Sequence, residues 1–278
     1  MRPERASQTA LKVALSLVTL SIKDDWAERL PGDLVPMTER LLVASGERGY
    51  GRRVVRWSKR PWALKWYERF DRLMPGQFEA LGHRKIFVQN QVEAAIKAGA
   101  RQVLVVGAGF DTLCLRLAPL FPELTFFEVD HPATYGAKRK GVLLEGQPTN
   151  MVQIAADLGE RPLSEVMKGN SRWDQGRQSV IVAEGLLQYL SDDAVRGLFK
   201  EVANITGPAS RFVFTHAIPG YRKIVDLLMR MIAEPWLSAV ASEELPTYIQ
   251  GTGWRVISGV DRNRAHGVER YAVAERVL

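Results

Sequence analysis

Short apolar runs alternate with helical stretches through the middle of this 278-residue chain. We expect the runs rich in β-branched and aromatic residues to form strands over 103–106, 124–129, 151–155, 179–183 and 211–215. Because few polar residues interrupt them, these runs are typical of parallel strands that are covered on both faces. Strands that alternate with helices in this way predict a doubly wound α/β sheet.

The first part of the chain shows helical periodicity and no strand pattern. Helices are expected over 9–22, 24–30 and 37–45, and then over a tryptophan-rich segment. The first helix is amphipathic, because Leu11, Ala14 and Val18 recur at helical spacing. It is too short and too often interrupted by polar residues to span a bilayer, and no cleavage site follows it. Without such a signal, the cytoplasm is the default location.

A glycine turn follows the first predicted strand, and an acid ends the second. Gly107-Ala-Gly109 comes directly after 103–106, and Asp130 directly after 124–129. Glycine lets a backbone turn tightly and approach a ligand closely, because no Cβ stands in the way. Doubly wound sheets hold an adenosine in this manner, with glycines beneath the cofactor and a carboxylate on the ribose hydroxyls.

The residues after the glycines favour a methyl donor over a dinucleotide. A pyrophosphate needs a third glycine and a free helix N-terminus, whereas this chain has Phe110, Asp111 and Thr112 there. An acid is unfavourable beside a pyrophosphate. S-adenosylmethionine carries a sulfonium and an ammonium and no phosphate, so nearby acids stabilise it. A turn that binds no ligand would explain the glycines but not Asp130.

Four motifs occur in order along the chain. They are Gly107-Ala-Gly-Phe-Asp-Thr112 with Arg116-Leu117, Glu128-Val-Asp-His-Pro132 with Lys138, Ala156-Asp-Leu158, and Ala183-Glu-Gly-Leu-Leu-Gln-Tyr-Leu190. Together they resemble the leucine carboxyl methyltransferase-like family, which uses S-adenosylmethionine and has many bacterial members. The resemblance covers roughly 81–214, with a weaker similarity in Ser7-Gln-Thr-Ala10.

The resemblance implies a Rossmann-like methyltransferase sheet of seven strands, closed by an antiparallel pair over 254–260 and 271–276. It also implies a helical lid after the fifth strand, about 219–250, and the expected helix 221–237 within it is strongly apolar. The predicted domains are an N-terminal helical cap, 1–77, and a donor-binding domain, 78–278. The implied activity is methyl transfer to an oxygen of a small acceptor, and the apolar lid predicts a hydrophobic one. S-adenosylhomocysteine would be the product.

Ligands of open α/β sheets bind beyond the carboxyl ends of the strands. The predicted donor-binding residues are Arg84, Gly107, Ala108, Gly109, Asp111, Asp130, Asp157, Leu158, Glu184 and Gly185. Asp130 is expected to accept from the ribose hydroxyls, although it could instead cap the following helix. Asp157 is expected to accept from the adenine amino group while Leu158 packs on the ring, or Asp157 belongs to a surface turn. Glu184 ends a buried strand and needs a partner there, such as the donor's ammonium.

Three further positions remain open. Arg84 resembles the family's arginine that grips the donor carboxylate, but Lys85 follows it where the family usually has threonine, so either can fill this role. Asp111 contacts the donor tail or caps the next helix. Tyr189 and His216 are the best-placed polar groups on the acceptor side, and we assign no catalytic base, because a carboxylate acceptor needs none.

Charge is concentrated in one segment. Residues 48–72 hold nine basic and two acidic side chains, which leaves 29 of each sign elsewhere and places the whole excess of +7 here. The first interpretation of this segment is a solvated basic face whose aromatic side chains pack inward, since Leu64, Tyr67 and Phe70 are at helical spacing. Tryptophans interleaved with the cations could instead contact an anionic membrane, an amphiphilic substrate or, less favoured, nucleic acid. The alternative function is accordingly a catalytically spent methyltransferase fold that binds a membrane surface or nucleic acid. One cysteine and four scattered histidines predict no metal site.

Overall fold

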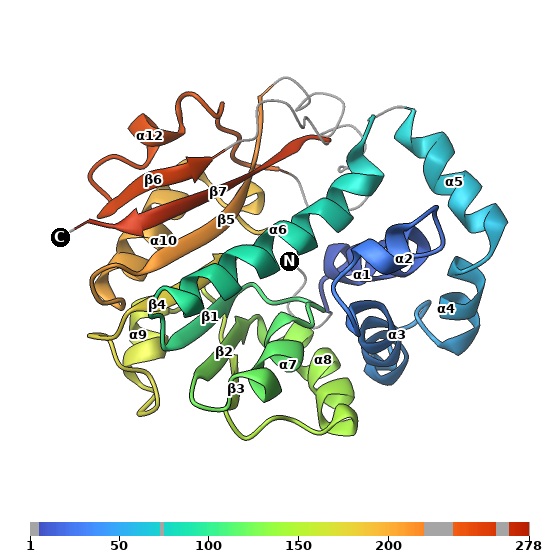
Figure 1. The fold of residues 1–278 in the computed structure, drawn as a ribbon, viewed down its shortest axis with the longest axis horizontal. Coiled ribbons are helices and arrows are strands. Elements are labelled where there is room, and N and C mark those ends of the chain that lie inside the picture. The colour runs from blue at the N-terminus through green and yellow to red at the C-terminus, as the bar shows by residue number, and fades with distance from the viewer. Residues whose placement is uncertain (1–5, 73–74, 220–235, 260–266, 278) are drawn as a thin grey trace.

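The computed structural model describes residues 6–72, 75–219, 236–259 and 267–277, and one seven-stranded sheet organises them (Figure 1). The strands are β1 (Gln102–Val106), β2 (Thr125–Asp130), β3 (Met151–Ala155), β4 (Ser179–Ala183), β5 (Arg211–Ala217), β6 (Trp254–Gly259) and β7 (Glu269–Arg276). Their order is β3-β2-β1-β4-β5-β7-β6. The first five strands are parallel, and β7 pairs antiparallel with both β5 and β6. The predicted sheet is confirmed.

Two apolar cores lie on opposite faces of the sheet because successive strand residues point to opposite sides. In β1, Val103 and Val105 belong to one core, and Leu104 and Val106 to the other. The first core is covered by α1 (Gln8–Leu20), α3 (Leu34–Ser45), α4 (Arg52–Ser58), α6 (Gln77–Lys97), α7 (Leu113–Leu117) and α8 (Pro132–Glu145). The second is covered by α9 (Leu163–Lys168), α10 (Asp192–Asn204) and α12 (Leu245–Tyr248).

The N-terminal helices share the first core with the sheet. Leu11, Val18 and Leu41 are fully buried in the same cluster as Val103. Short α2 (Trp26–Arg29) closes a smaller cluster with Phe78 at the start of α6. The described part of the expected cap therefore packs directly on the sheet.

The tryptophan-rich segment forms two helices instead of one. Helix α4 ends at Ser58, and α5 (Pro61–Asp71) begins two residues after the cap at Lys59. Proline has no N–H to continue a preceding helix and disfavours helical backbone in the residue before it, but it fits a first helical turn. Pro61 therefore separates the two helices.

The expected helix 221–237 lies almost wholly outside the described residues. Of the second expected helix, 242–250, the structure contains only the single turn α12. No helix in the described ranges is long and apolar enough to cross a bilayer. The lid therefore remains a prediction, and of its expected range, 219–250, the structure describes residue 219 and residues 236–250.

Candidate active site

A cavity of about 810 Å³ lies beyond the carboxyl ends of β1, β2, β3 and β4, within the usual range of roughly 300–1,000 Å³ for small-molecule sites. The strand ends contribute 107–111, Asp130, His131, 156–159 and 184–186. Helix α6 contributes Leu81, Arg84 and Lys85, and α1 contributes Ala10, Val13, Ala14 and Leu17. All ten predicted donor-binding residues thus line one cavity.

The glycine turn is shaped so that helix α1 can cover it. Gly107 and Gly109 have φ angles of +67° and +49°, which side-chain-bearing residues rarely adopt. A Cβ on Gly109 would lie 3.1 Å from the methyl group of Ala10. The hydroxyl of Ser7 caps α1 by accepting from the Ala10 N–H at 3.1 Å, and the Ser7 N–H donates to Thr134 Oγ1 at 3.0 Å. The start of α1 is thereby fixed against the turn and forms one wall of the cavity.

Asp130 is held at this turn by two backbone amides. Its Oδ2 accepts a short hydrogen bond from the Gly109 N–H, and its Oδ1 accepts from the His131 N–H at 2.6 Å. Burial raises the pKa of the carboxyl to about 6, although both amides and the Lys138 ammonium act to lower it. His131, not Asp130, caps α8 through its side chain. Asp130 is therefore an oriented carboxylate that faces the cavity.

A cluster of buried charges forms another part of the cavity wall. Arg84 donates to Glu184 Oε1 at 2.7 Å and to Glu269 Oε2 at 2.6 Å. Lys85 Nζ lies 2.8 Å from both Asp111 Oδ2 and Glu184 Oε1. The five side chains are at most 8% exposed. Burial alone would lower the pKa of Arg84 and of Lys85, but the neighbouring carboxylates outweigh burial and raise both.

Three carboxylates face two cations, so this cluster carries one excess negative charge. One buried oxygen of the cluster, Glu184 Oε2, has no hydrogen-bond partner among the described residues, and neither has the oxygen of the neighbouring Gln188 amide, Oε1. The amide of Gln188 is oriented by donation to Glu269 Oε1 at 2.8 Å. An unpaired buried acceptor is costly. The wall therefore suits a ligand that brings a positive charge with N–H donors.

Asp111 and Asp157 both accept backbone hydrogen bonds. Asp111 Oδ1 accepts from the Leu113 N–H at 2.8 Å at the start of α7 while Oδ2 pairs with Lys85. Burial would raise the pKa of Asp111, but the Lys85 ammonium lowers it. Asp157 Oδ1 accepts from the Gly159 N–H at 2.8 Å, and its Oδ2 lies 3.5 Å from His131 Nε2. Both therefore combine a turn or capping contact with a position on the cavity wall.

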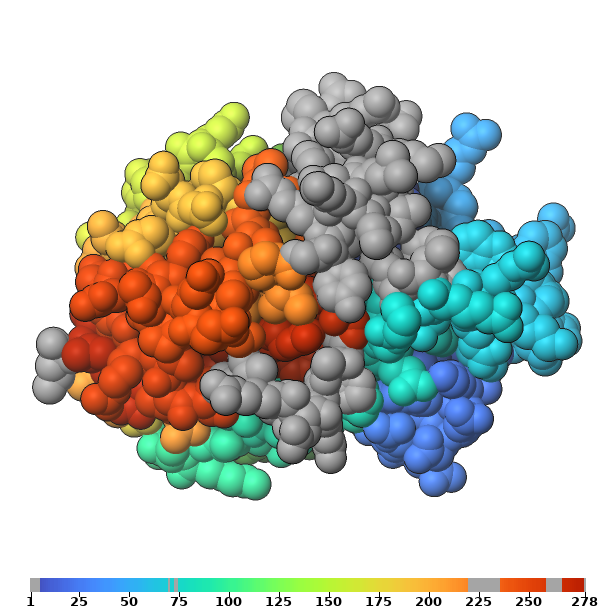
Figure 2. Space-filling view, turned by 90° about the horizontal axis from the view of Figure 1, so that it is seen from above, coloured from blue at the N-terminus to red at the C-terminus, as the bar shows by residue number. Residues whose placement is uncertain are grey.

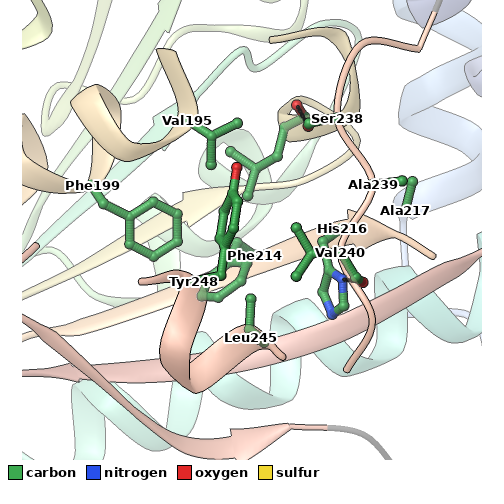
Figure 3. Close-up of a pocket in the computed structure, with 11 residues that line it drawn as sticks. Val195, Phe199, Phe214, His216, Ala217, Ser238, Ala239, Val240, Leu245 and Tyr248 are labelled. Carbon is green, nitrogen blue, oxygen red and sulfur yellow. Dashed lines mark hydrogen bonds between the residues drawn. The ribbon is translucent and has the colours of Figure 1, made fainter. Parts of the chain in front are cut away.

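The two acceptor-side candidates lie in different places. Tyr189 lines the cavity. His216 belongs to a separate, nearly filled pocket of about 10 Å³ between β5, α10 and α12 (Figure 3). There its Nδ1 lies 3.0 Å from Val240 O, and burial lowers the pKa of the ring. His216 is not among the residues that line the large cavity.

Sequence reasoning did not single out Glu269 or Gln188. An acid at the start of a strand is usually solvated, and only the fold brings Glu269 to Arg84, 185 residues away. Gln188 was visible inside the fourth motif, where it had no assigned role. No group of His, Cys, Asp and Glu in the described parts of the chain could hold a metal ion.

A model of the leucine carboxyl methyltransferase family matches residues 9–203. Two curated relatives carry the provisional name S-adenosyl-L-methionine-dependent methyltransferase. The one from Frankia alni is 28% identical over 66% of this chain and 64% of its own length. The one from Streptomyces coelicolor is 30% identical with the same coverage. The chain thus spans slightly less than two thirds of these relatives.

Solved structures show the same fold. A provisionally assigned methyltransferase from Thermobifida fusca superposes with a TM-score of 0.61 at 17% identity, over 86% of this chain and 94% of that one. An O-methyltransferase family protein from Burkholderia thailandensis superposes with a TM-score of 0.50 at 16% identity, over 69% and 57% of the two chains. At these identities the likeness establishes the fold alone.

Proposed function

Because this chain belongs to the leucine carboxyl methyltransferase family, we propose that its cavity binds S-adenosyl-L-methionine and that it methylates an oxygen of a small hydrophobic acceptor. The observation that carries the proposal is the buried wall with one excess negative charge and an unpartnered Glu184 Oε2. S-adenosylmethionine has one net positive charge at neutral pH, from its sulfonium, ammonium and carboxylate. The positive charge of this ligand therefore matches the excess negative charge of the wall, and its ammonium N–H groups can pair with the free oxygen of Glu184.

The positions of the other residues fit the remaining parts of the donor. Asp130 retains lone pairs beyond its two amide bonds and can accept from vicinal ribose hydroxyls. Asp157 and Leu158 stand together at the end of β3, where they can accept from and pack against adenine. When bound, the donor supplies a methyl group that is already activated, so the protein mainly aligns the acceptor and excludes water.

We expect either Arg84 or Lys85 to bind the carboxylate of S-adenosylmethionine, because both line the cavity. Arg84 has five N–H donors and directs two of them to Glu184 and Glu269. Lys85 has three and directs two of them to Asp111 and Glu184. Both cations therefore keep at least one N–H group with which to bind the ligand carboxylate. The choice between the two residues stays a prediction.

The acceptor is expected in the part of the cavity lined by α1. Val13 and Leu17 of α1 are apolar, and the cavity lining also contains the apolar side chains of Leu81 and Trp236. Two buried polar atoms, Thr9 Oγ1 and Trp236 Nε1, have no hydrogen-bond partner among the described residues. Both can donate to an acceptor oxygen. An apolar molecule with a carboxylate or hydroxyl fits this combination.

Calorimetry tests the donor site. We expect S-adenosylmethionine and S-adenosylhomocysteine to bind in the micromolar range that is typical of enzyme substrates. Glu184→Gln should weaken binding roughly tenfold or more, because a charged hydrogen bond contributes about 1.5–3 kcal/mol. Glu165→Gln, at an exposed position on α9, is the matched control and should bind as the wild type does. Absence of binding by both ligands would contradict the proposal.

Incubation of the protein with labelled donor and a cell extract tests methyl transfer. The label should move to a small molecule that extracts into organic solvent, and base-labile label would indicate a methyl ester. The alternative, a methyltransferase fold that has lost catalysis and binds a membrane surface or nucleic acid, has no support in the comparisons. It also gives no role to the buried Glu184 oxygen that lacks a hydrogen-bond partner. Donor binding without any labelled product would favour that alternative.

A further inference from the structure

Three tryptophans are exposed on the outer side of the N-terminal helices. Trp57, Trp62 and Trp66 have exposed fractions of 56%, 59% and 65%. Eight basic side chains between 52 and 72 are exposed with them, beside a single exposed acid, Glu68. The exposed side chains of 52–72 will be called the basic tryptophan surface. Figures 1 and 2 place α4 and α5 at the edge of the molecule, on the side away from β6.

On α5, rings and cations share one stripe. Trp62, Lys65, Trp66 and Arg69 are spaced i, i+3, i+4 and i+7, so their side chains project from one face of the helix. The opposite face is anchored in the protein, since Ala63 is buried and the Tyr67 hydroxyl accepts from Ser16 Oγ on α1 at 3.0 Å. The stripe is therefore held outward by the fold.

The cations of this surface are poorly neutralised by the protein itself. Among its eight basic residues, the described parts of the chain provide an ion pair only for Lys59, with Glu39 at 2.8 Å. Apolar rings amid unneutralised cations are unfavourable for a surface that meets only water, since self-repulsion and ring hydration both cost free energy. A partner with dense negative charge and an apolar interior would offset both.

From this complementarity we infer that the basic tryptophan surface docks the protein on an anionic lipid membrane. Tryptophan partitions to the interface between headgroups and acyl chains, and lysine and arginine are attracted to anionic headgroups. The surface lies one helix away from the cavity, because α1 packs on α4 and α5 while Ala10, Val13 and Leu17 of α1 line the cavity. Docking would thus bring the cavity wall close to the bilayer.

Two other partners fit less well. In a symmetric dimer the same patch meets itself, so two surfaces of like charge would repel each other. Single-stranded nucleic acid is usually held in a groove that tracks the backbone, and none of the three rings lines either of the two pockets described above. The membrane is therefore the partner that the observations favour.

Flotation with vesicles tests the inference. The 278-residue chain should bind vesicles that contain about one third phosphatidylglycerol at low salt, should not bind pure phosphatidylcholine, and should be released at high salt. Lys65→Glu/Arg69→Glu should reduce binding roughly tenfold or more, since each basic residue near an anionic surface contributes several-fold. Lys168→Glu/Lys200→Glu, an equal charge change at exposed positions of α9 and α10, should leave binding intact.

The tryptophans are tested separately. Trp62→Ala/Trp66→Ala should weaken vesicle binding, whereas Leu120→Ala/Leu144→Ala, which removes comparably exposed apolar groups elsewhere, should not. Circular dichroism and thermal melting establish that each variant is folded. Failure of the wild type to float with anionic vesicles at low salt would overturn the inference. So would tighter binding to a single-stranded oligonucleotide at the same salt, or a dimer that Trp62→Ala/Trp66→Ala dissociates.

Discussion

Burial of the Asp130 carboxylate affects its protonation, and its protonation is expected to affect the affinity for the ligand. Its pKa is raised to about 6 by burial, and the proposed ribose contact needs the ionised form. Donor affinity is therefore expected to rise about tenfold between pH 5 and pH 7, as the ionised fraction of the Asp130 carboxyl increases.

The variant Asp130→Ala should bind S-adenosylmethionine at least roughly tenfold more weakly at neutral pH, because it loses charged hydrogen bonds. Calorimetry against pH measures both effects.

The variant Asp130→Asn serves as the control for that titration. It should bind weakly with a nearly flat pH profile over the same range. If the wild type and Asp130→Asn change in parallel with pH, the titrating group is elsewhere and Asp130 does not bind the ribose.

The same carboxylate should cost the protein stability. Its pKa is raised from 3.8 to about 6 on folding, so the folded state binds the proton more tightly and stability falls as the pH rises from about 4 to 6. The ionised carboxylate is expected to cost the wild type up to about 3 kcal/mol of stability between pH 4 and pH 7, and Asp130→Asn, which has no carboxylate there to ionise, should lack this part of the pH dependence. Urea unfolding at pH 4 and pH 7 measures the difference.

Asp111 provides the comparison of opposite sign. The Lys85 ammonium outweighs burial and lowers the pKa of Asp111, so this carboxylate stabilises the fold above its unfolded pKa and loses that effect as the pH falls. Asp111→Asn should therefore be less stable than the wild type at pH 7, and this deficit should shrink as the pH falls below the unfolded pKa of the Asp111 carboxyl. A deficit that does not shrink at acidic pH would contradict the assigned environment of Asp111.

At the scale of elements, helices α3 and α8 pack unusually closely at Gly141. A Cβ there would lie 2.9 Å from the Leu41 Cα, which belongs to backbone that cannot turn aside. Gly141→Ala is expected to lower the free energy of unfolding by about 1–3 kcal/mol, as overpacking usually does. Chemical denaturation measures the change.

Gly136 lies in the same helix and is the matched control, because nothing lies within 4 Å of its Cβ position. Gly136→Ala should stabilise by up to about 1 kcal/mol through helix propensity alone. A destabilisation of similar size in both variants would show that the tight contact with α3 is not the cause.

At the scale of the whole molecule, the segment that begins at Trp236 lies at the cavity. Trp236 and Leu237 line it, and the Leu237 N–H donates to Gln188 O at 2.7 Å. If 219–250 acts as the predicted lid, hydrogen exchange at 236–240 should slow when S-adenosylhomocysteine is added. Protection that is complete without ligand would make this segment part of the core and would move the lid to α1.

The sequence alone was sufficient for the elements that leave a local pattern. Continuous apolar runs predicted the parallel strands, and the break at Gly107 with the acid at Asp130 predicted where a ligand cavity would lie. Such features are determined within a few residues, because strand burial, backbone torsion and the position of a strand end are set by near neighbours.

Only the tertiary structure decided which charges meet and which rings face water. Arg84 pairs with Glu269 across 185 residues, His216 points into a separate pocket, and Trp62 projects outward while Tyr67 of the same helix is anchored inward. Contacts between distant segments leave no periodic trace in a single sequence. A charged or aromatic residue looks the same along the chain whether the fold buries it against a partner or leaves it exposed.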